Sequence, residues 1–176
     1  MTRGKLTTIA IATIMILMIG ATPIATGQQQ RTAAATKQIE ITQRLKAHAN
    51  ATKMRQTIDV LITRAGRTRY VFSGSTTKGW DCSGLVVWTY KRFGITLPHS
   101  ADKQGHVGKR TTKPQPGDIV VFAYKGRTDF YHSAIYLGDG KIINANSAYG
   151  TTIIQRLTEY PNAQIRYVQI LKRIQQ

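Results

Sequence analysis

The sequence predicts an α+β fold in which helices come first and an antiparallel sheet follows. In the first half, apolar residues recur at helical spacing. In the second half, short runs rich in Ile, Val and Tyr alternate with turn residues, as strands do. Helices followed by a series of strands are typical of the α+β class. The length of 176 residues leaves room for one domain and an appendage.

The first 27 residues have the pattern of an export signal. Arg3 and Lys5 precede an apolar run from Leu6 to Ile19, and Ala25-Thr26-Gly27 fits a cleavage site. The alternative is an uncleaved anchor, but the apolar run is short for a membrane span. We therefore expect cleavage before Gln28, a secreted protein that is extracellular or associated with the cell wall, and contact with the membrane only during export.

Residues 28–53 form a polar segment with a thin apolar stripe, which predicts a linker or a loosely docked helix. At Met54 the helical spacing sharpens, and Gly66 is a natural stop for that helix. We therefore expect the folded domain to span residues 54–176.

A second helix is predicted directly after Asp81. The turn-rich run 73–79 leads to Cys82, the apolar segment 85–90 follows, and Gly94 ends it. Cys82 is the only cysteine, so the core must hold the fold without an intramolecular disulfide. A thiol in the first turn of a helix lies at the positive end of the helix dipole, which favours the thiolate. The alternative is a small buried apolar residue.

The rest of the chain is predicted to be a meander of strands. Residues 100–113 are polar and irregular, and 114–118 form a turn. The expected strands are 119–124, 131–137, 141–145, 151–156 and 165–171.

The hairpin around residues 138–140 contains a histidine and an asparagine. His132 opens one strand and Asn144 lies on the return strand. A two-residue turn would place them on opposite faces, whereas a three-residue loop ending in Gly140 at a left-handed position places them diagonally on one face. In that register Asn146 lies directly opposite His132 and is the rival partner.

The formal net charge is +17, of which two positive charges fall in residues 1–27. Glutamate occurs only at Glu40 and Glu159. This balance favours anionic partners such as wall polymers, nucleic acid or lipid. Because the basic residues are spread along the chain and not interleaved with aromatic ones, we expect a cationic surface and no specific nucleic-acid site.

Together these residues supply a candidate nucleophile, a base and an orienting group. Cys82 would attack a carbonyl, His132 would take the proton, and Asn144 would hold the imidazole. Two other histidines, His99 and His106, lie in predicted loops and are expected at the surface.

The chain resembles the NlpC/P60 family of papain-like cell-wall peptidases over roughly residues 54–174. The motifs that carry the resemblance are Tyr70-Val71-Phe72-Ser73-Gly74, Gly79-Trp80-Asp81-Cys82-Ser83-Gly84-Leu85-Val86, Leu97-Pro98 with Gln104, Pro116-Gly117-Asp118-Ile119-Val120-Val121-Phe122, and His132-Ser133-Ala134-Ile135-Tyr136-Leu137-Gly138-Asp139-Gly140-Lys141.

The resemblance implies hydrolysis of peptidoglycan stem peptides, typically at the bond between γ-linked D-glutamate and the diamino acid, without metal or cofactor. It implies that Cys82 is the nucleophile and His132 the base, with Asn144 in the third position, where the family more often has His. Three further residues would bind substrate: Tyr70 beside the nucleophile, and Asp81 and Ser83 at the free amino terminus of the stem peptide.

The chain departs from the family pattern at three other places. Arg69 replaces a frequent Pro, Ser73 replaces a Gly, and His99 stands where Arg is frequent. These changes put the substrate preference in doubt. Two other functions stay open: an amidase or acyl transferase with the same triad, and a catalytically silent cationic module that binds wall polymers.

Overall fold

A computed structural model describes residues 26–172. The chain divides into two units after Gln38. Most of the expected export signal, residues 1–25, lies outside the described residues. Within the part that is described, no helix is long and apolar enough to cross a membrane.

Helix α1, Gly27–Ile62, contains the whole of residues 28–53 that were expected to be a linker or a helix. The structure has the helix, and the expected domain start at Met54 lies inside it. Its buried residues are Ala47, Met54, Thr57, Ile58 and Leu61. Thr57 and Ile58 lie three and four residues after Met54, and Ala47 and Leu61 lie seven residues on either side of it, which places all five on one face of the helix.

Helix α2, Cys82–Lys91, is the buried helix that the sequence predicted. Leu85, Val86 and Tyr90 are at most 1% exposed, and Gly94 leaves the helix region with a φ of 71°. Two short strands, β1 (Ser75–Thr76) and β2 (Gly79–Trp80), pair in the loop before the helix. The expected turn-rich run is therefore a small hairpin that delivers the chain to Cys82.

Residues 100–113, expected to be irregular, contain two short elements. Helix α3, Ala101–Gln104, begins at Ser100, whose side chain accepts a hydrogen bond from the N–H of Lys103. Strand β3, Lys109–Thr111, pairs with the last strand of the chain. Elements this short depend on tertiary contacts, which local pattern does not reveal.

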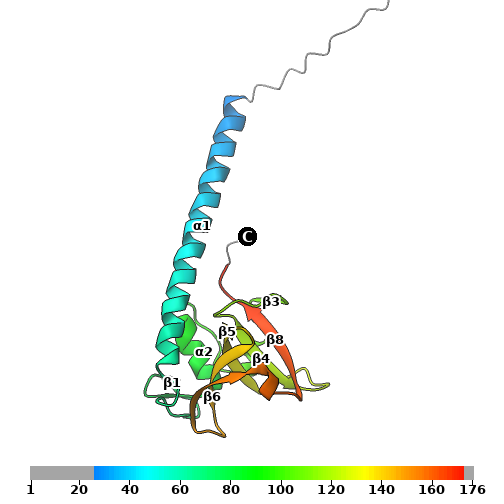
Figure 1. Cartoon of the computed structure of the whole chain (residues 1–176). Coiled ribbons are helices and arrows are strands. Elements are labelled where there is room, and N and C mark those ends of the chain that lie inside the picture. Colours follow the sequence, from blue (N-terminus) through cyan, green and yellow to red (C-terminus); the bar gives the residue numbers. More distant parts are fainter. Residues whose placement is uncertain (1–25, 173–176) are drawn as a thin grey trace, which may run out of the picture. The chain divides into compact units, whose positions relative to one another are not determined.

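The described chain forms an antiparallel sheet of six strands in the order β3-β8-β4-β5-β6-β7 (Figure 1). The α+β prediction is thereby confirmed. The strands are β4 (Ile119–Tyr124), β5 (His132–Gly138), β6 (Lys141–Asn146), β7 (Thr151–Arg156) and β8 (Ala163–Gln169), with a short 3₁₀ helix, Leu157–Glu159, between the last two.

The two faces of the sheet bury different clusters. One face packs against α1 and α2 in a single cluster that includes Ile58, Leu85, Val121 and Ile135. The other face carries a smaller cluster that includes Phe122. Alternation along β5 therefore gives neighbouring residues on this strand different surroundings.

Candidate active site

The Asp81 carboxylate fixes the start of α2 and the loop before it. Its Oδ1 accepts hydrogen bonds from the Gly84 N–H at 2.7 Å and the Ser83 hydroxyl at 3.0 Å. Its Oδ2 accepts the Ser73 N–H at 2.9 Å. The first-turn N–H groups of a helix lack intrahelical partners, so this cap decides where α2 begins. It makes Cys82 the first residue of the helix.

Gly84 is required by the close approach of the loop to the helix. A Cβ at this position would lie 1.8 Å from the Gly74 carbonyl oxygen and 3.0 Å from Nε2 of His99. The same Gly74 oxygen accepts the Asp81 N–H at 3.1 Å, so the loop cannot move away without losing that bond. The Asp-Cys-Ser-Gly motif is thus a packing requirement as well as a chemical one.

The Cys82 thiol is partly buried, and burial raises its pKa above the ordinary value. The nearby Asp81 charge acts in the same direction. The Ser133 N–H and hydroxyl and the Ser83 N–H face the sulfur and act in the opposite direction, but they do not outweigh burial. The first-turn N–H of Ser83 acts in the direction expected of the helix terminus, but burial has the larger effect and the thiol pKa is raised.

The Cys82 sulfur thus lies next to Ser133, the residue directly after His132 on β5. The Ser133 hydroxyl is buried and has no oxygen or nitrogen partner among the described residues. It is therefore free to donate a hydrogen bond to a thiolate at Cys82. Sequence reasoning gave Ser133 no role.

His132 and Asn144 are joined by a hydrogen bond of 3.0 Å between Nε2 and Oδ1. The hairpin has the expected bulged register, with Ile135 opposite Ile143 and an irregularity between Tyr136 and Gly138. Gly140 has the expected left-handed conformation, with a φ of 69°. Burial lowers the pKa of His132 to about 4, while the bond to Asn144 acts in the opposite direction. The ring is therefore neutral near pH 7.

The orientation of the Asn144 amide follows from its other bonds. Its Nδ2 donates to Oε1 of Gln155 at 3.1 Å, which leaves Oδ1 as the atom that faces His132. The neutral imidazole must then carry its proton on Nε2, and Nδ1 is left unprotonated. Gln155 is held in turn by the Tyr160 hydroxyl at 2.6 Å and by Glu159 at 3.1 Å.

Asn146, the rival of Asn144, lies in the same network without a bond to His132 in the described part. It is half-buried, whereas Asn144 is fully buried. Its Nδ2 donates to Gln155 at 3.2 Å, and its Oδ1 accepts the Ala148 N–H at 3.0 Å. Gln155 and Tyr160 were missed by sequence reasoning, because only the folded sheet brings β7 and the following turn to Asn144.

His99 is not the plain surface residue that its loop suggested. Its Nε2 lies 2.9 Å from Oδ1 of Asp81, and its side chain is 32% exposed. It therefore belongs to the surroundings of Asp81 and the start of α2. His106 is more exposed, at 55%, and lies 3.7 Å from Asp102, away from Asp81.

The three residues expected to bind substrate surround Cys82. Burial raises the pKa of Tyr70, and the nearby Cys82 and Asp81 charges add to this effect, which places the phenol beside both. The pKa of Asp81 is lowered: burial acts to raise it, but hydrogen bonds from Gly84, His99 and Ser83 together prevail. Asp81 is thus an anion near pH 7. Among the described residues, no group of three or more His, Cys, Asp or Glu side chains is placed to hold a metal ion.

Comparison with known proteins decides the family. The NlpC/P60 family model matches residues 66–171, more than half of the chain. The chain belongs to the NlpC/P60 family. It is 36% identical over 98 residues to a probable endopeptidase of Mycobacterium bovis, covering 54% of this chain and 24% of that one. A γ-D-glutamyl-L-lysine dipeptidyl-peptidase of Bacillus cereus is 37% identical over 82 residues, 45% of this chain and 25% of the relative.

Solved structures agree with this assignment. A crystal structure of an NlpC/P60 family protein from Bacillus cereus superposes with a TM-score of 0.58 at 28% identity, covering 64% of this chain and 39% of that one. The match spans only about a quarter of the length of the two curated relatives, the Mycobacterium bovis endopeptidase and the Bacillus cereus peptidase.

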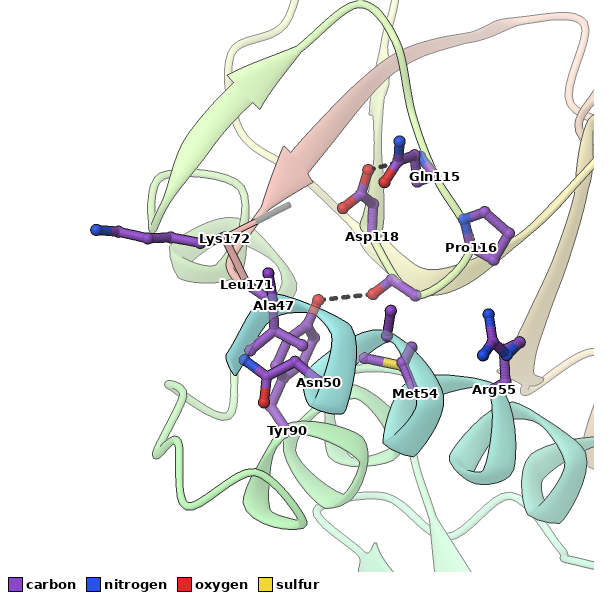
Figure 2. Close-up of a pocket in the computed structure, with 12 residues that line it drawn as sticks. Ala47, Asn50, Met54, Arg55, Tyr90, Gln115, Pro116, Asp118, Leu171 and Lys172 are labelled. Carbon is purple, nitrogen blue, oxygen red and sulfur yellow. Dashed lines mark hydrogen bonds between the residues drawn. The ribbon is translucent and has the colours of Figure 1, made fainter. Parts of the chain in front are cut away.

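The NlpC/P60 domain also has a cavity of about 280 Å³ that lies apart from Cys82. Figure 2 shows it between α1, which contributes Asn50, Met54 and Arg55, and the turn at Pro116. Tyr90 lines it and donates a hydrogen bond of 2.6 Å to the Gly117 carbonyl. Tyr90 follows Cys82 by eight residues, about 12 Å along the axis of α2. This cavity is therefore not the site of the chemistry.

Proposed function

We propose that the protein is a secreted cysteine peptidase that hydrolyses peptidoglycan stem peptides. The observation that carries the proposal is the 3.0 Å hydrogen bond between Nε2 of His132 and Oδ1 of Asn144. His132 is the first residue of β5, and Ser133, the residue after it, faces the Cys82 sulfur. Cysteine, histidine and an orienting amide are the parts of a papain-like triad. The similarity to endopeptidases, including one named for a γ-D-glutamyl-L-lysine substrate, supports the same reading.

In the proposed reaction the resting pair is uncharged, because the Cys82 thiol is protonated and the His132 ring is neutral near pH 7. As the sulfur attacks the scissile carbonyl carbon, Nδ1 of His132 takes the thiol proton. The imidazolium then donates that proton to the leaving amine, and a thioester remains on Cys82. His132 next takes a proton from water, whose hydroxyl attacks the thioester and releases the acid and the thiol. Asn144 keeps Nε2 protonated and the ring aimed throughout.

The substrate is proposed to be a stem peptide cut between γ-linked D-glutamate and the diamino acid. Tyr70, Asp81 and Ser83 are proposed to receive its free amino terminus, since the Asp81 carboxylate is ionised and lies next to the nucleophile. The peptide would then lie across Cys82 with its amino end held at the N-terminus of α2. The proposal includes export, which the pattern of residues 1–27 supports.

The test is digestion of purified muropeptides, followed by mass spectrometry. Wild-type protein and a Ser147→Ala control, altered at an exposed turn residue, should release fragments with a new γ-D-glutamyl carboxyl end. Cys82→Ala should release none while keeping the circular dichroism of the wild type. A folded Cys82→Ala variant that still cleaves refutes the proposal. Products that carry an added amine instead of water would show an acyl transferase, and wall binding without any product would show a silent binding module.

A further inference from the structure

A hollow of about 70 Å³ on the domain is lined by three arginines from three separate elements. Arg110 comes from β3, Arg127 from the turn after β4, and Arg166 from β8. Strands β3 and β8 lie side by side at the edge of the sheet (Figure 1). The other lining residues are Thr128, Phe130, Gln164 and Ile165, so no carboxylate lines the hollow.

Arg166 is held rigidly in this hollow. Its guanidinium lies over the Phe130 ring at 4.7 Å from the centroid, and its Nη1 donates to the Gly105 carbonyl at 3.2 Å. Gly105 must lack a side chain here, since a Cβ would lie 2.3 Å from the Phe130 ring. A planar guanidinium fixed by stacking loses little further freedom when it binds an anion.

The three positive charges of the hollow are neutralised only in part. Arg127 makes a forked contact with Asp129, at 2.9 and 3.4 Å. Asp102, the other carboxylate nearby, accepts the Phe130 N–H at 3.1 Å. The Arg110 side chain is exposed, and no hydrogen bond or ion pair joins it to another side chain within residues 26–172, although its backbone pairs with β8. Gathered like charges repel each other, and a bound anion would remove that repulsion.

We propose that this arginine hollow, Arg110, Arg127 and Arg166, binds a phosphodiester group of an anionic wall polymer. A tetrahedral phosphate group presents oxygens to several guanidinium forks at once, whereas one fork can satisfy a carboxylate, as Arg127 does for Asp129. The hollow is small, at about 70 Å³, which suits a single oxyanion better than a nucleobase. The only aromatic face there, that of Phe130, is covered by Arg166 and is not free for base stacking.

The hollow lies near the proposed peptidase site, because Phe130 precedes His132 by two residues. A polymer held there would keep the domain on the wall beside its peptide substrate. The proposed polymer binding does not depend on the chemistry at Cys82, so the two proposals can be refuted independently.

The test measures binding of a synthetic glycerol phosphodiester hexamer to the full chain by calorimetry. Arg110→Gln should weaken binding about tenfold, since it removes a charged hydrogen-bonding fork. The matched control Arg67→Gln removes the same charge from an exposed turn and should change binding less than twofold. Arg166→Lys keeps the charge but loses the fork, and it should also weaken binding severalfold.

Equal losses in Arg110→Gln and Arg67→Gln would show nonspecific attraction to a basic protein and overturn the proposal. Full binding by Arg166→Lys would likewise reduce the site to simple charge. A glutamate hexamer that binds Arg110 as tightly as the phosphodiester would make it a carboxylate site and refute the phosphate assignment. An oligothymidylate that binds more tightly than the glycerol polymer would point to nucleic acid instead.

Discussion

The burial of His132 should make the protein lose stability in mild acid. The unfolded chain takes up a proton at this residue as the pH falls through about 6.5, whereas the folded chain takes it up only near pH 4. The folded state therefore carries its full stability above pH 6.5 and loses part of it as the pH falls toward 4. At 1.36 kcal/mol per pH unit, the difference between the two pKa values corresponds to about 3 kcal/mol of unfolding free energy. Because the ring keeps some contact with solvent, the expected loss is about 2–3 kcal/mol.

The perturbation is replacement of His132 by Gln or Phe, neither of which titrates. Urea unfolding at pH 7, 6, 5 and 4 gives the free energy of unfolding of each protein. Other titrating groups are common to all three, so the difference between wild type and variant isolates His132. Between pH 7 and pH 4, the wild type should lose about 2–3 kcal/mol more unfolding free energy than either variant does.

The two variants control for packing. Gln and Phe fill the space beside Phe122 and Tyr160 differently, so their stabilities at pH 7 are expected to differ. Their pH dependence should nevertheless be the same, because it reflects only the missing proton. If either variant follows the wild-type pH dependence within about 0.5 kcal/mol, the inferred burial of a neutral His132 is refuted.

Two further outcomes concern the neighbours of the triad. Asn144→Asp places a carboxylate beside His132, which raises the pKa of the ring. The acid limb of the kcat/KM profile should therefore move to higher pH by about one unit or more. Asn146→Asp should move that limb less, and a larger movement in the Asn146 variant would exclude Asn144 as the partner of His132. His99→Ala removes a hydrogen-bond donor from Asp81 and should raise KM roughly three- to tenfold for stem peptides with a free amino terminus, with kcat little changed. His99→Gln should keep KM close to the wild-type value, and His106→Ala should leave it unchanged. An unchanged KM in His99→Ala would show that His99 takes no part in substrate binding.

The strand half of the fold was predictable because its local signals agree with one another. Strands β4 and β7 have the bounds that the alternation predicted, and β5 and β6 differ from the prediction by one residue at one or both ends. The left-handed Asp139 and Gly140, with φ of 50° and 69°, set the register that joins His132 to Asn144. The sequence placed the turn but left a two-residue and a three-residue loop open, and the structure has the bulged register.

Other parts of the site depend on contacts between distant residues. His99 reaches Asp81 across 18 positions of the chain, and Gln155 reaches Asn144 from the next strand. The protonation states of Cys82 and His132 depend on how much water the fold removes from them, because burial is the largest cause of both pKa shifts. No periodicity or motif carries that quantity.

The protonated, partly buried state of Cys82 has a consequence for resistance to oxidants. Peroxides attack the thiolate, so a raised thiol pKa slows the formation of sulfenic acid at Cys82. The chain has no second cysteine that could trap a sulfenic acid as an internal disulfide. Oxidation of this residue should therefore be slow but, once begun, should proceed to sulfinic and sulfonic acids that the protein cannot reverse by itself. The burial that raises the pKa of the Cys82 thiol should thus also slow its oxidation.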